Sequence, residues 1–166
     1  MIFVTVGTHE QQFNRLIKEI DDLVKKGVVK DRVIIQYGYC TYEPKFCECQ
    51  RFFSFDEMSN LINEADIVLC HGGPATFMSV LNKGKIPIVV PRQNFFGEHI
   101  NNHQLDFVRE VKKRKYEIIV VEDINLLSSA ISKNYSKGGR NNSSNNQKFS
   151  LQFIKIIQEE LIKSDS

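Results

Sequence analysis

Short runs of apolar, mostly β-branched residues alternate along this chain with longer stretches of helical periodicity. This alternation constrains the fold more than any other feature of the sequence. The predicted strands are residues 2–6, 33–36, 46–53, 67–70, 88–90 and 117–121. The predicted helices are residues 12–26, 76–83, 101–113 and 124–134, and one that Ser54 or Asp56 caps and that runs through Glu64. Strand and helix in repeated order predict an α/β fold, a Rossmann-like parallel sheet with helices on both faces.

The rhythm stops after residue 135, which predicts one domain followed by two further segments. Residues 136–150 (SKGGRNNSSNNQKFS) are rich in Gly, Asn and Ser and are interpreted as a flexible linker. Residues 151–166 form an amphipathic pattern that predicts a final helix. Its apolar face fits packing on the same domain, and it also fits docking on a partner or a membrane surface.

Charge and cysteine content exclude several classes of function. The chain has 22 Lys plus Arg residues and 20 Asp plus Glu residues. This nearly even balance lacks the basic excess that is typical of nucleic-acid-binding proteins. The four cysteines form no C-x-x-C pair, and Cys70 at the end of an apolar run is expected to be a buried thiol. With no signal peptide and an apolar N-terminal run too short to span a bilayer, we expect a cytoplasmic protein.

Polar segments follow three predicted strands, at the edge where open parallel sheets bind ligands. In the first, Gly7 and Thr8 precede a helix and offer backbone N–H groups to an anion, although an ordinary turn explains them equally well. The spacing there matches neither the dinucleotide fingerprint nor the phosphate-binding P-loop. In the second, residues 71–76 combine two glycines, a helix-starting proline and a threonine. That combination is typical of a pyrophosphate cradle, and a tight turn without a ligand is the alternative.

The third polar segment follows the strand at residues 88–90. Arg92 is expected to neutralise phosphate, and Asn102 and Gln104 supply the donors and acceptors that sugar hydroxyls need. His99 and His103 stand four residues apart, a zinc-like spacing, but no third ligand is evident and no metal is expected.

Three sequence strings in order resemble the C-terminal, donor-binding half of family 28 glycosyltransferases. They are ADIVLCHGGPAT at residues 65–76, GKIPIVVP at 84–91 and HINNHQ at 99–104. The family includes the bacterial transferase that makes lipid II and the cytosolic subunit of the eukaryotic dolichol-linked UDP-GlcNAc transferase. The likeness is closest to small bacterial capsule and exopolysaccharide subunits that begin with VGTHE, found here at residues 6–10. It covers residues 1–125.

The resemblance implies the C-terminal half of a GT-B glycosyltransferase, with a role for each matching residue. It implies phosphate contacts for Gly7 and Thr8 and places the uracil at Phe53. The donor site that it implies further comprises His71, Gly72, Gly73, Pro74 and Thr76 at the pyrophosphate, and Arg92, Glu98, His99, Asn102, His103 and Gln104 around the phosphate and sugar. Ser79 stands where relatives carry a Glu that grips the ribose, which makes the UDP assignment less secure.

The reaction that the resemblance implies is inverting transfer of a hexose, galactose in the closest group and by β-1,4 linkage, from a UDP-sugar to a lipid-linked saccharide. A membrane-associated subunit would bind the acceptor and recruit this chain to the inner face of the plasma membrane. No D-x-D motif occurs, so helix N-termini and Arg92 are expected to stabilise the leaving group without a metal or another cofactor. His9 and Glu10 are the local candidates for the general base. One alternative is a non-catalytic nucleotide-sugar-binding regulatory subunit. The other is a Rossmann-type epimerase, but the dinucleotide fingerprint that such an enzyme needs after the first strand does not occur in this sequence.

Overall fold

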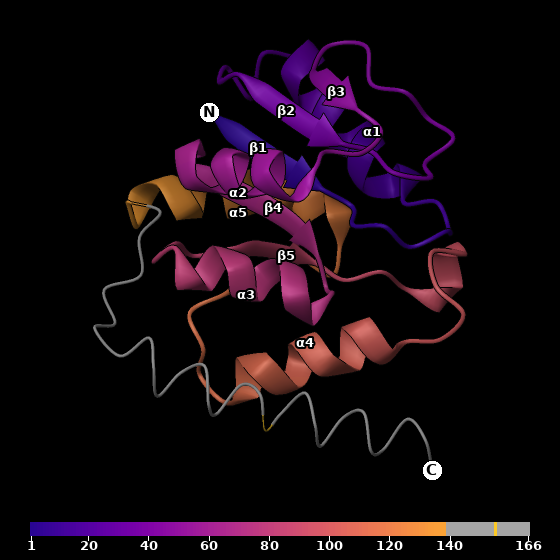
Figure 1. Cartoon of the computed structure of the whole chain (residues 1–166), viewed down its shortest axis with the longest axis vertical. Helices are drawn as coiled ribbons and strands as arrows, with labels where there is room; N and C mark the ends of the chain where they lie inside the picture. Colours follow the sequence, from indigo (N-terminus) through magenta and orange to yellow (C-terminus); the bar gives the residue numbers. More distant parts are fainter. Residues whose placement is uncertain (139–154, 156–166) are drawn as a thin grey trace.

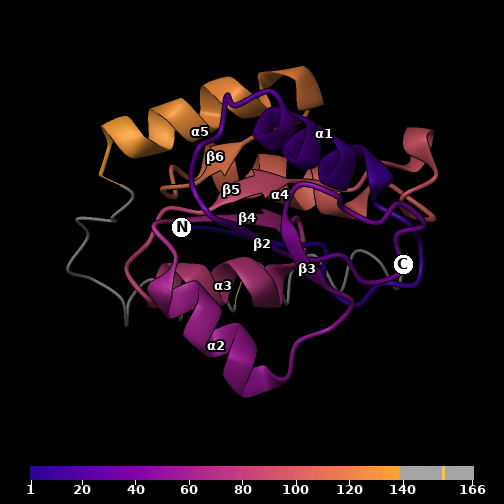
Figure 2. The same cartoon turned by 90° about the horizontal axis from the view of Figure 1, so that it is seen from above.

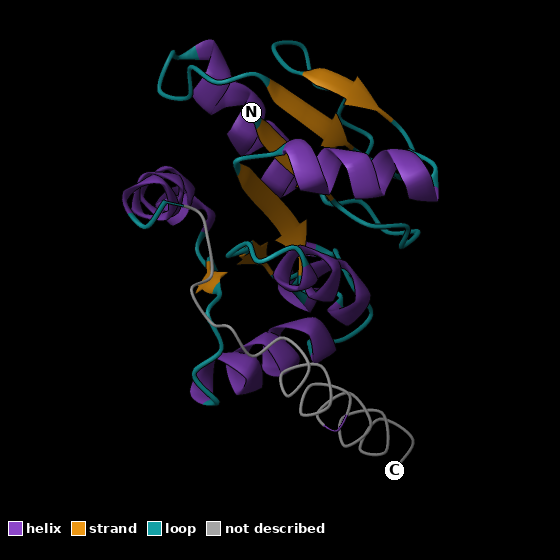
Figure 3. Ribbon diagram, turned by 60° about the vertical axis from the view of Figure 1, so that its left-hand side comes forward, coloured by secondary structure: helices purple, strands orange, loops and turns teal. Residues whose placement is uncertain are grey.

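In the computed structural model, which describes residues 1–138 and 155, a six-stranded sheet forms the centre of the protein (Figure 1). The strands are β1 (Ile2–Thr5), β2 (Val33–Gln36), β3 (Glu48–Gln50), β4 (Ile67–His71), β5 (Ile88–Val90) and β6 (Ile119–Val120). Their order is β3-β2-β1-β4-β5-β6, every neighbouring pair is parallel, and the arrows of the longer strands point the same way (Figure 3). The predicted parallel sheet is therefore confirmed.

Helices cover both faces of the sheet, as the alternation predicts. They are α1 (Asn14–Lys25), α2 (Phe55–Glu64), α3 (Pro74–Asn82), α4 (His103–Lys113) and α5 (Leu127–Ser136), with short 3₁₀ turns η1 (Asn94–Phe96) and η2 (Ile124–Leu126). Helices α1 and α5 lie on one side of the strands, and α2 and α3 lie on the other (Figure 2). Phe107, Val108 and Val111 of α4 pack with Phe77 of α3, so α4 joins the second side.

Alternate residues of each strand feed the two cores, because successive strand side chains point to opposite faces. Ile2 and Val4 of β1 join the core under α1 and α5, whereas Phe3 packs under α2 and α3. All three of these side chains are fully buried. Strands buried on both faces carry continuous apolar runs, which is the pattern that predicts them here.

The predicted strand at residues 46–53 is shorter in the structure and leaves Phe46 and Phe53 outside it. The segment between β2 and β3 has no helix and is held by buried Asp21 of α1. That carboxylate accepts hydrogen bonds from the Tyr42 hydroxyl at 2.6 Å and from the backbone N–H groups of Lys45 and Phe46. Because these hydrogen bonds fix the loop to α1, only three residues remain to pair with β2.

The end of the domain differs slightly from the predicted boundary. Ser136, the first residue of the predicted linker, is the last residue of α5, and Gly138 follows with a left-handed φ of 71°. The rest of the linker and the predicted helix at 151–166, apart from Lys155, lie outside the described residues. Among the described helices, none has the length and hydropathy needed to cross a bilayer. All four cysteines are free thiols, and Cys70 is fully buried as expected.

Candidate functional site

A cavity of about 580 Å³ opens at the carboxyl edge of the sheet, where β1 and β4 lie side by side. The connections leave β1 and β4 toward opposite sides of the sheet, and such a switch point is where open α/β sheets bind ligands. The cavity is lined by Thr5, Gly7, Thr8, Gln36, Phe53, Phe55, Met58, Ser59, Ile62, His71, Gly73, Pro74, Ala75, Thr76, Ser79, Asn82 and Lys83. Its volume is that of a small-molecule site.

The N-terminus of α3 forms one wall of this cavity. Gly73 has an extended backbone at the N-cap and Pro74 occupies the first helical position, as the sequence predicts for a proline there. The first turn of a helix leaves backbone N–H groups without intrahelical partners, and the helix dipole adds positive potential. Ala75 and Thr76 belong to this turn and line the cavity, so an anion fits there.

His71 lies between the two glycines that the sequence singles out. A Cβ added to Gly7 would stand 2.4 Å from its Cε1, and a Cβ added to Gly73 would stand 2.2 Å from its Nε2. Gly7 also has a φ of 73°, a conformation that other residues adopt at a cost. The imidazole ring of His71 therefore requires glycine at both positions.

Burial keeps the His71 ring neutral at physiological pH. Desolvation, reinforced by the nearby Arg92 guanidinium, lowers the pKa of His71 to about 3. A neutral imidazole at the cavity wall adds no charge that would attract phosphate. The positive potential of the cavity therefore comes mainly from the α3 N-terminus and from Lys83.

The opposite wall comes from α2 and the segment before it. Ser54 caps α2 through a reciprocal capping box with Glu57, so the next residue, Phe55, projects into solvent with 87% of its surface exposed. The Phe53 ring packs against Phe3, and its backbone N–H donates to Gln36 Oε1 at 2.9 Å. This side of the cavity is apolar, which suits a flat base or a sugar face.

Several lining residues were not predicted from the sequence: Gln36, Phe55, Met58, Ser59 and Lys83. The capping-box pattern at residues 54–57 is the sequence feature that could have identified Phe55, because it places this aromatic residue at the first position of the helix. Ser79 also lines the cavity and donates its hydroxyl to the Ala75 carbonyl at 3.0 Å.

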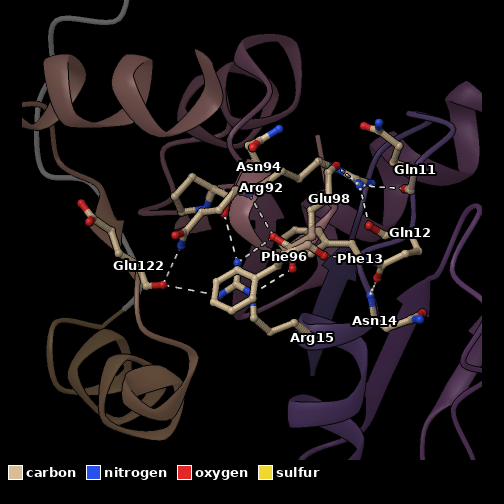
Figure 4. Close-up of polar contacts among 12 residues, drawn as sticks. Gln11, Gln12, Phe13, Asn14, Arg15, Arg92, Asn94, Phe96, Glu98 and Glu122 are labelled. Carbon is tan, nitrogen blue, oxygen red and sulfur yellow. Dashed lines mark hydrogen bonds and ion pairs between the residues drawn. The ribbon is translucent and has the colours of Figure 1, made fainter. Parts of the chain in front are cut away.

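Arg92 requires a correction, because it does not offer its guanidinium to phosphate. The side chain is fully buried, and Nη1 donates to the backbone carbonyls of Gln11, Gln12 and Glu98 at 2.8–3.1 Å (Figure 4). Nη2 donates to the Val6 carbonyl at 2.9 Å. Burial lowers its pKa to about 10, so the group stays cationic at neutral pH. Arg92 joins the loop after β1 to the loop after β5.

Glu98 is likewise buried, and its carboxylate is bound by protein groups. Arg15 of α1 binds its carboxylate with two hydrogen bonds of 2.8 and 2.9 Å, and the Gln93 backbone N–H donates to it at 3.0 Å (Figure 4). With its oxygens used in this way, Glu98 fixes the loop at residues 92–99 onto α1. The expected sugar contact is corrected to a structural role.

The remaining predicted residues gather beside the cavity without lining it. The rings of His9 and His99 stack at 4.6 Å with an interplanar angle of 12°. Asn102 Oδ1 accepts from the Asn94 backbone N–H, and Gln104 Oε1 accepts from that of Arg92. Gly72 lies under α4 against Gln104, His103 begins α4, and Glu10 and Asn102 are exposed.

No cluster of three His, Cys, Asp or Glu side chains with metal-binding geometry occurs in residues 1–138. The cavity instead combines a helix N-terminus, hydroxyl groups and an aromatic wall at the switch point of a parallel sheet. This combination defines the protein class as an open α/β domain with a small-molecule cavity at its switch point.

The chain belongs to the glycosyltransferase family 28 C-terminal domain, whose family model matches residues 1–161. The human UDP-N-acetylglucosamine transferase subunit ALG13 is 31% identical over 121 residues, 68% of this chain. The mouse subunit of the same name is 28% identical over 120 residues. The chain spans about 10% of the length of these two relatives.

Solved structures share the fold. The glycotransferase of kitacinnamycin superposes with a TM-score of 0.54 at 13% identity, and the glycosyltransferase SnogD from Streptomyces nogalater with 0.51 at 15%. Each match covers 96% of this chain and 39% of the other. The Rossmann-like α/β fold, expected from the sequence, is thereby confirmed.

Proposed function

We propose that this chain is the donor-binding, catalytic subunit of a hexosyltransferase that moves galactose from a UDP-sugar to a lipid-linked saccharide in capsule or exopolysaccharide synthesis. The observation that carries the proposal is the cavity at the sheet's switch point, with the α3 N-terminus on one side and the aromatic α2 wall on the other. Membership of family 28 supports sugar transfer as the reaction class.

The cavity supports a nucleoside diphosphate in one orientation. The diphosphate lies against the backbone N–H groups of Ala75 and Thr76, and the base lies along Phe53 and Phe55. When the bond to the sugar breaks, negative charge accumulates on the diphosphate, and the helix dipole stabilises it without a metal ion. Transfer then proceeds with inversion at the anomeric carbon.

The acceptor belongs to a membrane-associated partner subunit in this proposal. The loop after β5 supports a partner because it exposes three apolar side chains: Phe95 at 87%, Phe96 at 44% and Ile100 at 73%. The loop is rigid, since Asn94 donates to the carbonyls of His99 and Ile100 and the Gln12 side chain donates to that of Phe96. Preorganised aromatic side chains are typical binding anchors. The chain would thus be cytoplasmic and recruited to the inner face of the plasma membrane.

Calorimetry of the isolated chain with UDP, UMP, uridine and ADP tests the donor site. We expect UDP to bind more tightly than UMP and uridine, because only the diphosphate reaches the α3 N-terminus. Ser79→Glu adds a carboxylate at the expected ribose position. We expect it to increase the affinity for UDP about tenfold, because the carboxylate accepts a charge-assisted hydrogen bond from a ribose hydroxyl. If no nucleoside diphosphate or UDP-hexose binds, with or without a membrane partner, the proposal fails.

A panel of UDP-sugars, offered to the chain together with its membrane partner, tests the reaction. We expect UDP-galactose to be consumed and the isolated chain to transfer poorly. Phe95→Ser is expected to leave UDP binding unchanged and to weaken co-purification with the partner. Consumption of a different UDP-sugar would correct the donor, and strong transfer by the chain alone would contradict the two-subunit arrangement.

The alternative function is a non-catalytic nucleotide-sugar-binding regulatory subunit. Ser79 favours it, because it supplies no carboxylate for the ribose, and so does the position of Asn102 and His103 outside the cavity lining. Nucleotide binding without donor consumption by the assembled pair would select this alternative.

A further inference from the structure

Two histidines from distant loops stack beside the cavity. His9 follows Gly7 and Thr8, which line the cavity, and His99 lies in the loop after β5. Their rings are 4.6 Å apart and nearly parallel. The buried Arg92 holds the two loops together through the carbonyls of Gln11 and Glu98, so the stack is built into the fold.

Hydrogen bonds define where each ring carries its proton. Gln11 Oε1 lies 2.8 Å from His9 Nε2, and an amide oxygen only accepts, so Nε2 carries the hydrogen. In the neutral ring, the lone pair of His9 therefore lies on Nδ1. In His99 the Nδ1 atom accepts from the Asn101 backbone N–H at 3.3 Å, so its hydrogen is on Nε2 and the ring is neutral.

The charges around the stack favour a neutral His99. Burial, the facing His9 and the Arg92 guanidinium lower the pKa of His99, while its contact with Asn101 opposes the shift. His71 is close enough to interact with both rings and is also neutral. The buried carboxylate of Glu98 is bound by Arg15, and Glu10 is exposed on the His9 loop. When His9 takes a proton, its closest ring neighbour is thus an uncharged imidazole.

We propose that His9 accepts the proton of the acceptor hydroxyl through Nδ1, and that Gln11 and His99 are the positioning residues that prepare it for this step. The inference rests on the proposed sugar transfer. The acceptor O–H bond breaks and its proton goes to Nδ1, while the oxygen bonds to the anomeric carbon. The bond from that carbon to the diphosphate breaks, and its electron pair leaves with the nucleoside diphosphate. His9 then releases the proton to water.

The first test reads the tautomers directly in the isolated full chain. Long-range ¹H–¹⁵N NMR of the four imidazoles, assigned by single substitutions, reports which nitrogen of each ring carries the hydrogen. We expect Nε2–H for both His9 and His99 at neutral pH. Gln11→Leu should release the His9 tautomer, whereas Gln11→Glu should retain it, because a carboxylate also accepts from Nε2. An Nδ1–H tautomer of His9 in the unchanged chain would overturn the inference and leave the proposed function intact.

The second test measures transfer by the chain with its membrane partner. His9→Ala should lower kcat on the order of 10²- to 10⁴-fold, the usual contribution of a general base, with little change in UDP affinity. Added imidazole should restore part of the rate. Gln11→Leu and His99→Ala should lower kcat about tenfold with an unchanged donor KM, and His99→Phe should recover activity by restoring the stack.

Outcomes separate the two ideas. A wild-type pair that consumes no UDP-sugar overturns the proposed function and the inference with it. An active pair whose His9→Ala variant keeps its rate overturns the inference alone. A folded His9→Ala variant that binds UDP, transfers slowly and responds to imidazole supports both.

Discussion

At the scale of single residues, the arrangement around His71 explains why glycines flank the cavity. The ring occupies the space that a Cβ would need at both Gly7 and Gly73. The glycines in these short polar strings allow close packing of an imidazole, and in the proposed function they serve a second purpose, access of a ligand to the backbone. Unfolding measurements without a ligand distinguish the two purposes, because only the packing against the imidazole then affects stability.

We predict that Gly7→Ala destabilises the protein more than Gly27→Ala. Both positions have φ near 70°, so each change costs roughly 1–2 kcal/mol of backbone strain. An added Cβ at Gly7 also collides with His71, which adds roughly 1–3 kcal/mol, whereas it meets nothing within 4 Å at Gly27. Urea unfolding measures both values. Equal losses would show that the ring moves aside freely.

We predict that mild acid destabilises the fold through His71. The pKa of His71 is near 3 in the native state and about 6.5 when unfolded, so the unfolded chain binds more protons between these values. Stability is therefore complete above pH 6.5 and decreases as the pH falls toward 3, by roughly 2 kcal/mol between pH 7 and pH 5.

Denaturant titrations at both pH values check this loss. His71→Gln should reduce the pH dependence without removing it, because the pKa of His99 is also lowered by burial. His103→Gln, at an exposed position on α4, is the matched control and should change little. An unchanged pH dependence in His71→Gln would contradict the predicted burial of a neutral ring.

At the scale of elements, the side chains of Arg92 and Arg15 connect the loops at the carboxyl edge of the sheet. Arg92 joins the loop after β1 to that after β5, and Arg15 joins α1 to Glu98 (Figure 4). These contacts position His9 against His99 and leave Phe95 exposed. The loops are therefore held in place before any ligand or partner arrives.

We predict that Glu98→Gln costs about 3 kcal/mol or more of unfolding free energy, because it leaves the 11%-exposed Arg15 without its counter-charge. Glu48→Gln breaks the exposed pair with Arg32 and is expected to cost little. Chemical denaturation with and without 1 M NaCl compares them. Salt should reduce only the small effect at Glu48, since a buried pair is poorly screened. A Glu98 variant as stable as the Glu48 variant would contradict the structural role.

At the scale of the whole molecule, residues 1–138 contain all the strands of the described sheet and its three apolar clusters. We predict that a chain ending at Gly138 unfolds cooperatively at nearly the urea midpoint of the full chain. Its binding of UDP should also be retained, because the cavity lining ends at Lys83. A broad transition or loss of UDP binding would show that the later residues complete the domain.

Local sequence patterns are sufficient to predict the succession of strands and helices along the chain, the parallel sheet and the positions of the glycine-containing turns. Local periodicity reports which face of an element is buried, and Gly, Pro and capping residues report where each element begins or ends. The glycines and the proline in residues 71–76 therefore predict a strand-to-helix turn, with Pro74 in the first turn of the helix. The ends of the strand predicted at residues 46–53 do not follow from the local pattern, because tertiary contacts of Asp21 shorten that strand.

The contacts of each polar side chain, in contrast, depend on how the folded chain brings distant segments together. Arg92 and Val6 lie 86 positions apart, and Arg15 and Glu98 lie 83 apart, so no local pattern reveals that they bind each other. An arginine near a predicted phosphate site has the same sequence signature whether it faces ligand or backbone. In the folded chain Arg92 binds backbone carbonyls, because two loops that meet at the sheet edge leave carbonyl groups that need a buried donor.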